Sequence, residues 1–376
     1  MGSKAESVYA VGLDGIAAAR TRLSRIDGEK GELIIAGFPV EELAPNAVFE
    51  ETFFLLLHDR IPTNPELLEF KNTLSSLRTL PKSVEPLLQS AASHGSSITD
   101  MLRMASASLS IGMETEDPVF TGMRAVAAFP TAVASAYRAL KNLPNIPPDP
   151  GLSHAANFLW MLSGSLASPV QIRALDTYWN TVADHGLNPS TFAARVIAST
   201  RSDLISAITG ALGALKGPLH GGAPGPALDM VFEIGTEERA EEVIQAKLAA
   251  KERLMGFGHR LYRVRDPRAD VLAAQAHQLY EATPELRRLY ELAMHVEKTA
   301  LRLLSAAHPD RPLKTNVEFY TALLLHGIGL DRDLFTPTFA CARAAGWTAH
   351  AIEQSKERIL RPDAEYIGAT GRRWKN

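Results

Sequence analysis

The sequence predicts an all-α protein built from two domains. Apolar residues recur at helical spacing through most of the chain, and the alternation typical of β-strands is nearly absent. The length of 376 residues exceeds what one hydrophobic core usually serves, which favours two domains. A glycine-rich turn near Gly221 and a return near Gly327 predict the boundaries. The large domain is expected at 1–221 and 328–376, and the small domain at 222–327.

The first elements differ from the rest of the chain. A turn sequence at 26–31 leads into an apolar run at 33–35, which predicts a small β-hairpin. Asn64 followed by Pro65 predicts the cap and first turn of a helix. Helical spacing predicts further helices in the first half of the chain at residues 49–57, 97–113, 120–140, 154–163, 170–181 and 191–208.

The second half of the chain opens with glycines and small residues at 210–225, where backbones can lie close together. A highly charged helix is predicted beyond it, at 237–252. Helical spacing then predicts helices at 268–282, 284–305, 316–325 and 337–357. The tail from Arg358 is basic and rich in turn-forming residues.

Composition excludes several classes of protein. The net charge of -3 and the lack of a long basic run argue against a nucleic-acid partner. Cys341 is the only cysteine, which excludes an intramolecular disulfide and suits a reducing cytosol. We find neither the long uncharged run of a membrane span nor the pattern of a secretion signal. A soluble, cytoplasmic protein without a membrane or nucleic-acid partner is therefore expected.

The segment 255–268 (MGFGHRLYRVRDPR) is the strongest candidate for a site. Glycines on either side of Phe257 let a ligand approach the backbone, with His259 at the edge of that approach. Four arginines follow within nine residues, and Pro267 marks the start of a helix. An imidazole beside guanidinium groups suits a carboxylate or phosphate substrate that reacts at a carbonyl. The alternative is a simple turn between two helices with solvated arginines.

Three further segments carry candidate groups, each with a structural alternative. In GPLHGGA (217–223), a helix N-terminus would keep His220 neutral, or His220 is a core histidine bonded to a carbonyl. In NVEFY (316–320), desolvation would make Glu318 a usable base, or its carboxylate caps the helix. In an apolar stretch, Arg343 requires an anion, either a ligand or a salt-bridge partner.

In their order along the chain these segments resemble the citrate synthase family. The motifs that carry the resemblance are GPLHGG, MGFGHRLYRVRDPR and NVEFYTALLL, with RLSRIDGE near the N-terminus and RPDAEY in the tail. The resemblance implies an α-helical homodimer whose large and small domains close over oxaloacetate and an acyl-CoA. It implies a transferase that makes citrate through an enolate, as in the tricarboxylic acid cycle, with no metal or redox cofactor.

The resemblance also assigns roles residue by residue. His220 matches the histidine that bonds the thioester oxygen, His259 the one that polarises the ketone, and Glu318 the base. Oxaloacetate would be bound by residues matching His185, Arg268, Arg343 and, supplied across the dimer interface, Arg361. The CoA side would be lined by Arg263, Gly256, Phe257 and Gly258, and Lys251 is a further candidate on its charge and position.

One departure from the family pattern concerns the base. The family usually has aspartate where this chain has Glu318, and the extra methylene would move the carboxylate by roughly an ångström on an unchanged backbone. The small worth of one methylene in an apolar pocket leaves one alternative to citrate synthase open, and Glu318 leaves another. One is 2-methylcitrate synthase, which uses propionyl-CoA, and the other is a weakly active paralogue that binds CoA or a dicarboxylate.

Overall fold

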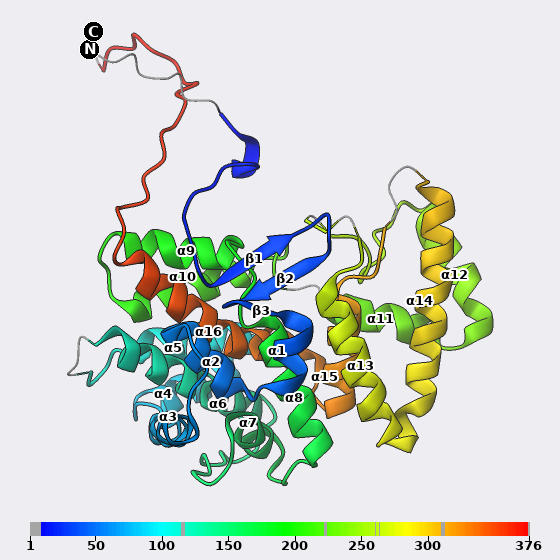
Figure 1. The fold of residues 1–376 in the computed structure, drawn as a ribbon, viewed down its shortest axis with the longest axis horizontal. Helices are drawn as coiled ribbons and strands as arrows, with labels where there is room; N and C mark the ends of the chain where they lie inside the picture. The colour runs from blue at the N-terminus through cyan, green and yellow to red at the C-terminus, as the bar shows by residue number, and fades with distance from the viewer. Residues whose placement is uncertain are drawn as a thin grey trace.

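Helices dominate the computed structural model, which describes residues 9–113, 117–221, 224–259, 261–262, 264–309 and 313–374. These residues form sixteen α-helices and one small sheet, which confirms the all-α class (Figure 1). The helices are α1 (Val40–Asn46), α2 (Phe49–His58), α3 (Asn64–Ser76), α4 (Val84–Ser93), α5 (Ile98–Ser108), α6 (Pro118–Leu140), α7 (His154–Ser163), α8 (Pro169–Val182), α9 (Pro189–Ser199), α10 (Leu204–Leu215), α11 (Pro224–Ile234), α12 (Ala240–Ala249), α13 (Pro267–Glu281), α14 (Arg287–Ala307), α15 (Val317–Ile328) and α16 (Phe335–Gln354).

The predicted hairpin forms the sheet. Strands β1 (Ser24–Asp27) and β2 (Glu32–Ile35) pair antiparallel, with Ser24 opposite Ile35 and Asp27 opposite Glu32. A third strand, β3 (Phe38–Pro39), pairs with β2 and leads directly into α1. Figure 1 shows the hairpin lying across the helices, with its turn directed toward the end of the molecule that carries α11 to α14.

Helix α16 runs through the core of the larger helical group. Alanines on several sides of it are buried, which lets neighbouring helices approach closely. A Cβ at Gly346 would lie 2.3 Å from the carbonyl oxygen of Ala183, so the loop after α8 passes against the α16 backbone. The helix therefore holds both that loop and the buried Arg343 in place.

Helix α6 also belongs to this core. By length and composition it could cross a membrane, but 78% of its most apolar window is buried inside the structure. That degree of burial is what a core helix of a globular protein shows.

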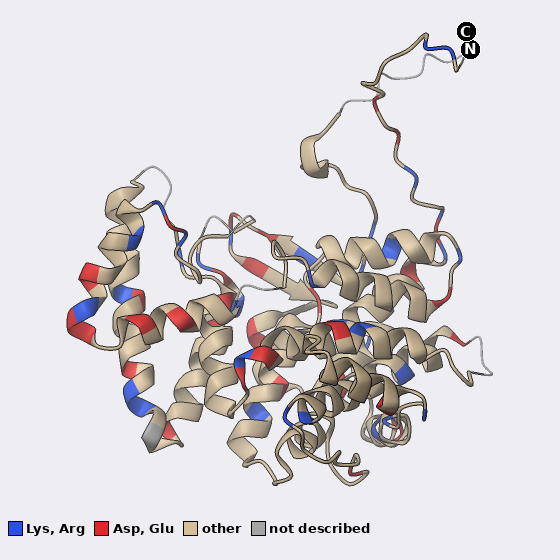
Figure 2. Cartoon of the chain, turned by 180° about the vertical axis from the view of Figure 1, so that it is seen from behind, with Lys and Arg blue, Asp and Glu red and all other residues tan. Residues whose placement is uncertain are grey.

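The helices of the predicted small domain lie together at one end of the molecule (Figure 1). Acidic and basic residues are interspersed along this end, as Figure 2 shows, and Arg302 of α14 pairs with Glu241 of α12. Helices α13 and α15 pack against α8 and so join the two groups. The division into domains at residues 222 and 327 stays a prediction, since it concerns relative motion.

Several expected boundaries were wrong. The helix predicted at 97–113 ends at Ser108, and the helix predicted at 284–305 is a 3₁₀ turn (Pro284–Leu286) followed by α14. The helix predicted at 191–208 is two helices, because Asp203 caps a new start with its Oδ1 2.8 Å from the Ser206 amide. The charged helix predicted at 237–252 is a 3₁₀ turn (Glu237–Arg239) followed by the shorter α12. The cap of α3 is Thr63 rather than Asn64, and Glu66 Oε2 accepts a hydrogen bond from the Thr63 amide at 2.8 Å.

Candidate active site

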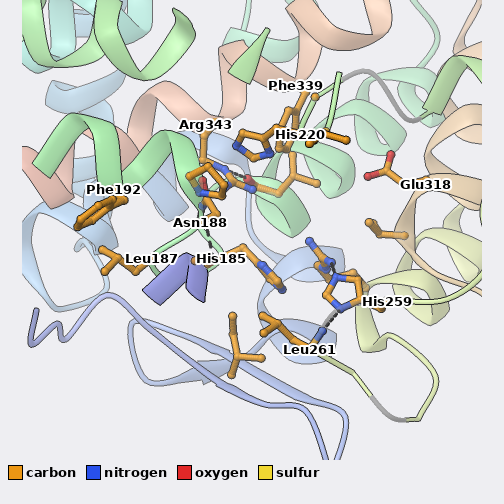
Figure 3. A pocket seen from close by; sticks show the side chains of 18 of the residues that line it. His185, Leu187, Asn188, Phe192, His220, His259, Leu261, Glu318, Phe339 and Arg343 are labelled. Carbon is orange, nitrogen blue, oxygen red and sulfur yellow. Dashed lines mark hydrogen bonds between the residues drawn. The ribbon is translucent and has the colours of Figure 1, made fainter. Parts of the chain in front are cut away.

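The candidate residues from distant parts of the sequence line one cavity of about 620 Å³. Its walls come from the loop after α8, the turn before α11, the segment before α13, and helices α15 and α16. Figure 3 shows the side chains of His185, His220, His259 and Arg343 around this space, with the Glu318 carboxylate directed into it. The predicted residues that line it are His185, His220, His259, Arg268, Glu318 and Arg343.

The orientation of His259 is set by the backbone that follows it. Its Nδ1 accepts hydrogen bonds from the amides of Leu261 at 3.0 Å and Tyr262 at 3.1 Å. Since Nδ1 accepts, the proton of the neutral ring sits on Nε2. Burial, aided by the positive charge of Arg268, lowers the pKa of His259 to about 4, so the ring is neutral at pH 7.

Arg268 brings a second N–H donor next to Nε2 of the His259 imidazole. Its Nη2 lies 3.3 Å from His259 Nε2, so two N–H donors meet with no acceptor between them. An oxygen atom placed between them would receive both hydrogen bonds. This geometry suits the binding of a carbonyl or carboxylate oxygen.

Asp266 stabilises the positive charge of Arg268. The Asp266 carboxylate accepts from Arg268 Nη2 at 2.8 Å and Nε at 3.0 Å, and both side chains are buried. Burial alone would lower the pKa of Arg268, but the attraction of Asp266 outweighs it and the pKa is raised. Asp266 also caps α13 through the amide of Arg268.

Arg343 is a buried cation with an unused donor. Its Nε donates to the carbonyl of Val182 at 2.7 Å, while its Nη1 is buried without a hydrogen-bond partner. Among the described residues no carboxylate forms a salt bridge with it, so the structural alternative for Arg343 is not realised. Burial lowers the pKa of Arg343 to about 10, with Asp184 partly offsetting the effect, so it stays charged at pH 7. A buried guanidinium of this kind calls for an anionic ligand.

His185 lies between these groups. Its ring is 6.0 Å from that of His259, nearly perpendicular to it, and its Nε2 is 3.2 Å from the hydroxyl of Tyr262. Burial, followed by the charges of Arg268 and Arg343, lowers the pKa of His185 well below its usual value. His185 is therefore a neutral hydrogen-bonding group beside two cations.

His220 reaches the cavity from the turn before α11. Its Nε2 lies 2.8 Å from the hydroxyl of Ser190, which is also contacted by Trp347 Nε1 at 3.1 Å. Burial, followed by the charge of Arg343, lowers the pKa of His220 to about 4, so the ring is neutral at pH 7. The helix N-terminus expected to do this begins only at Pro224. Within the part of the chain that the structure describes, no carbonyl bonds the His220 ring, so the alternative of a core histidine bonded to a carbonyl is not realised there.

Glu318 keeps its carboxylate free of the helix terminus. Asn316 caps α15 instead, and its Oδ1 accepts from the Glu318 amide at 3.0 Å. Burial raises the pKa of Glu318 to about 7, Arg268 opposes the rise, and Asp266 adds to it. A carboxyl with this pKa, half-buried on a cavity wall, has the proton affinity that a general base needs.

The described residues predicted to bind CoA do not line the cavity. The backbone of Gly256 and Gly258 pairs with the segment before α15, and the side chain of Phe257 packs on Phe319. Lys251 lies exposed on the turn after α12, outside the cavity lining. Arg263 lies outside the described residues. Their role in binding CoA stays a prediction.

Arg361 does not reach the cavity of its own chain. It lies in the exposed segment 356–374, which leaves the body of the molecule as extended chain (Figure 1). An arginine that binds substrate in the site of a partner chain would have to lie outside the site of its own chain. This role of Arg361 also stays a prediction.

Sequence reasoning missed four polar residues that orient the predicted ones. They are Asn188, Ser190, Tyr262 and Asp266. The sequence could have predicted Asp266 as a helix cap, because an aspartate directly before Pro267 marks a helix start. Ser190 carried none, since its contacts with His220 and Trp347 join segments far apart in the sequence.

The fold and site together define a helical protein whose cavity brings a buried arginine donor, neutral histidines and a carboxyl group with a raised pKa to one place. A family model described as citrate synthase, C-terminal domain, matches residues 12–363. The chain is similar to citrate synthase 2 of Bacillus subtilis, at 38% identity over 95% of each chain. It is also similar to a 2-methylcitrate synthase of Shewanella oneidensis, at 34% identity over 99% of this chain and 98% of the relative.

A solved structure extends the comparison to three dimensions. Citrate synthase from Thermoplasma acidophilum, solved as a ternary complex, is similar to this chain with a TM-score of 0.89.

 The complex contains carboxymethyl coenzyme A and oxaloacetate, and the two chains are 31% identical over 98% of each. On the family model, the relatives and this structure, the chain belongs to the citrate synthase family.

Proposed function

We propose that the protein condenses acetyl-CoA with oxaloacetate to give citrate and CoA. The observation that carries the proposal is the meeting of two N–H donors, His259 Nε2 and Arg268 Nη2, in a cavity that also holds a free carboxyl group. Relatives named citrate synthase and 2-methylcitrate synthase both match the chain, so family membership alone leaves the acyl group open.

Oxaloacetate would bind through its two carboxylates and its ketone. The unused Nη1 of Arg343 and the forked guanidinium of Arg268 suit carboxylate oxygens. The Nε2–H of His259 would donate to the ketone oxygen and draw electron density from the carbonyl carbon. His185, neutral and adjacent, would complete the polar wall.

The acyl-CoA would lose a proton from the carbon next to its thioester. In this scheme Glu318 takes the proton, and a neutral His220 donates through Nδ1 to the developing enolate oxygen. Donation from Nδ1 requires Nε2 to accept a hydrogen bond from the Ser190 hydroxyl at 2.8 Å. That hydroxyl donates to Asn188 Oδ1 at 2.7 Å in the structure, so the scheme requires its single proton to turn to His220.

The enolate carbon would then attack the polarised ketone carbon, and water would cleave the resulting CoA thioester. Protein side chains and the two substrates carry each of these steps, so the scheme requires no metal or redox cofactor. Exclusion of water until the carbon–carbon bond forms would prevent early loss of the thioester.

We further propose a cytoplasmic homodimer in which Arg361 of one chain binds oxaloacetate in the site of the other. The exposed course of segment 356–374 supports a role outside its own chain.

The first test measures the initial rate of free thiol release with oxaloacetate, using acetyl-CoA and propionyl-CoA in parallel. The proposal predicts a higher kcat/KM for acetyl-CoA. A higher value for propionyl-CoA would instead identify a 2-methylcitrate synthase. Release at background level with both, while oxaloacetate still binds by calorimetry, would contradict the proposed activity and identify a binding paralogue.

A further inference from the structure

Strand β1 and the turn after it contact both loops that carry the candidate histidines His185 and His259. Ser24 Oγ donates to Asp184 Oδ2 at 2.5 Å and accepts from the Gly186 amide at 2.7 Å. These contacts hold the residues on either side of His185. Ile26, two residues along, lines the cavity and lies close to Gly186, where an added Cβ would be 3.2 Å from Ile26 Cδ1.

Gly28, two residues further, meets the other loop. A Cβ on Gly28 would lie 2.2 Å from the carbonyl oxygen of Leu261 and 2.9 Å from its carbonyl carbon. Gly28 is not in the left-handed region, so the backbone conformation alone would accept alanine. Glycine is therefore needed here for space: the turn packs backbone against backbone.

The peptide that Gly28 contacts is one of the two whose N–H groups orient His259. Its carbonyl belongs to Leu261, and its N–H, on Tyr262, donates to His259 Nδ1 at 3.1 Å. A shift of this peptide would change the hydrogen bond that keeps the proton of His259 on Nε2. The same turn makes a second contact nearby, because a Cβ on Gly31 would lie 2.6 Å from Val264 Cγ2 and 3.1 Å from the Arg265 carbonyl oxygen.

We propose that Gly28 is a positioning residue, which holds the Leu261–Tyr262 peptide and through it fixes the tautomer and direction of the His259 imidazole. Ser24 and Ile26 hold the His185 loop from the same strand, so β1 sets the spacing of the two histidines. The consequence for catalysis rests on the proposed function, whereas the effect on the imidazole does not.

The test compares Gly28→Ala with the matched control Gly151→Ala. Gly151 lies on an exposed loop outside the cavity, and its added Cβ would meet only the flexible side chain of Asp149, at 3.3 Å. Nitrogen-15 spectra of histidine-labelled protein, with the His259 signals assigned by loss in His259→Gln, report the tautomer without any substrate. Thiol release then reports kcat and KM for oxaloacetate.

We expect His259 to hold a single Nε2–H tautomer in the wild type and in Gly151→Ala, and a mixture in Gly28→Ala. We also expect kcat/KM for oxaloacetate to fall by about 10- to 100-fold in Gly28→Ala, the scale of an ångström of misplacement. An unchanged tautomer with a rate within about twofold of the control would overturn the proposal.

A second pair of variants serves if Gly28→Ala does not fold. Gly31 and Gly37 both have positive φ, which asparagine tolerates, but only Gly31 has a neighbour within 4 Å. Gly31→Asn should disturb the His259 tautomer in the same sense, and Gly37→Asn should not; equal spectra for the two would overturn the proposal. The two proposals can also fail separately. If the wild type releases no CoA but the Gly28 or Gly31 variant changes the His259 tautomer, the positioning role is supported and the proposed activity is contradicted.

Discussion

At the scale of single residues, the cavity holds the carboxyl group of Glu318 near two cations, Arg268 and Arg343, without an ion pair between Glu318 and either arginine. Arg268 is paired with Asp266, and the Nη1 donor of Arg343 is unused, while Glu318 has a raised pKa. A direct ion pair between Glu318 and either arginine would lower that pKa and weaken the base. The separate partner of Arg268 therefore preserves the proton affinity of Glu318.

Replacing Glu318 by glutamine should remove the base with little effect on oxaloacetate binding. We expect kcat to fall by about 10²- to 10⁴-fold, the usual contribution of general base catalysis, with a nearly unchanged Kd for oxaloacetate by calorimetry. In the wild type kcat should rise with pH through about 7, because the base must be deprotonated. Equal rates in the two proteins would remove the assignment.

The same substitution should change how stability depends on pH. Glu318 holds its proton up to about pH 7 in the folded protein but only to its usual value of 4.5 when unfolded. The folded state therefore binds more protons between these values, and its stability falls as pH rises through this window. Glu318→Gln should lack this contribution, so its Tm relative to the wild type should be higher at pH 8 than at pH 4. A constant difference would contradict the raised pKa.

Arg343→Lys should weaken oxaloacetate binding more than it slows the chemical step. Lysine keeps the charge but loses the planar donors that hold the Val182 carbonyl and leave Nη1 free for a carboxylate. We expect KM for oxaloacetate to rise by about 10- to 100-fold, given about 1.5–3 kcal/mol for a hydrogen bond to a charged group. A variant with an unchanged KM would show that Arg343 is structural.

Residue types and their order were enough to predict the six groups that line the cavity. The chain motifs carry these groups in recognisable local contexts, as HGG does for His220 and NVE for Glu318. The groups that orient them were harder to predict, because Ser190 and Tyr262 act through contacts between distant segments. Local sequence contains no record of such contacts.

At the scale of elements, the segment before α15 is tied to the segment that carries His259. The amide of Asn316 donates to Gly256 O at 2.9 Å, and its side-chain Nδ2 donates to Gly258 O at 2.8 Å. The amide of Gly258 donates in turn to Lys314 O at 2.7 Å. Glu318 and His259 are thus placed relative to each other by one short pairing of backbones.

Asn316→Ala should lower both stability and activity, because Asn316 caps α15 and also holds Gly258. The matched control is Ser153→Ala, which removes the cap of α7 away from the cavity. Loss of the cap should cost each variant about 1 kcal/mol in the free energy of unfolding. Asn316→Ala should cost about 1 kcal/mol more, because it also loses the hydrogen bond to Gly258 O. Only Asn316→Ala should reduce kcat, by about tenfold or more. Equal kcat losses in both variants would show a general effect of destabilisation.

Helical spacing predicted most elements, and its failures have local causes. The stretch 191–208 looks continuous because its apolar spacing persists across the break, which Asp203 creates by capping the next helix. The third strand, β3, has only two residues, Phe38 and Pro39, too few for a periodic signal. The first feature depends on a side-chain cap and the second on strand pairing, and the apolar pattern encodes neither.

At the scale of the whole molecule, the segments at both ends of the described chain leave the body in the same direction (Figure 1). Apolar side chains on them are exposed, including Tyr9 at 71%, Ile367 at 91% and Trp374 at 94%. Large apolar side chains left in solvent favour burial against another chain. This exposure agrees with the proposed dimer and with the path proposed for Arg361.

Mixing two inactive chains tests whether Arg361 crosses between subunits. In a heterodimer of Arg361→Ala and Arg343→Ala chains, the site on the first chain keeps its own Arg343 and receives an intact Arg361 from its partner. Random pairing of equal amounts should therefore restore about a quarter of the wild-type sites, since half of the dimers are mixed and each has one complete site. If Arg361 served its own chain, every site would lack one arginine and no activity would return. Native mass spectrometry of tagged chains would verify that heterodimers had formed, so that the absence of recovery could be read as evidence against the shared site.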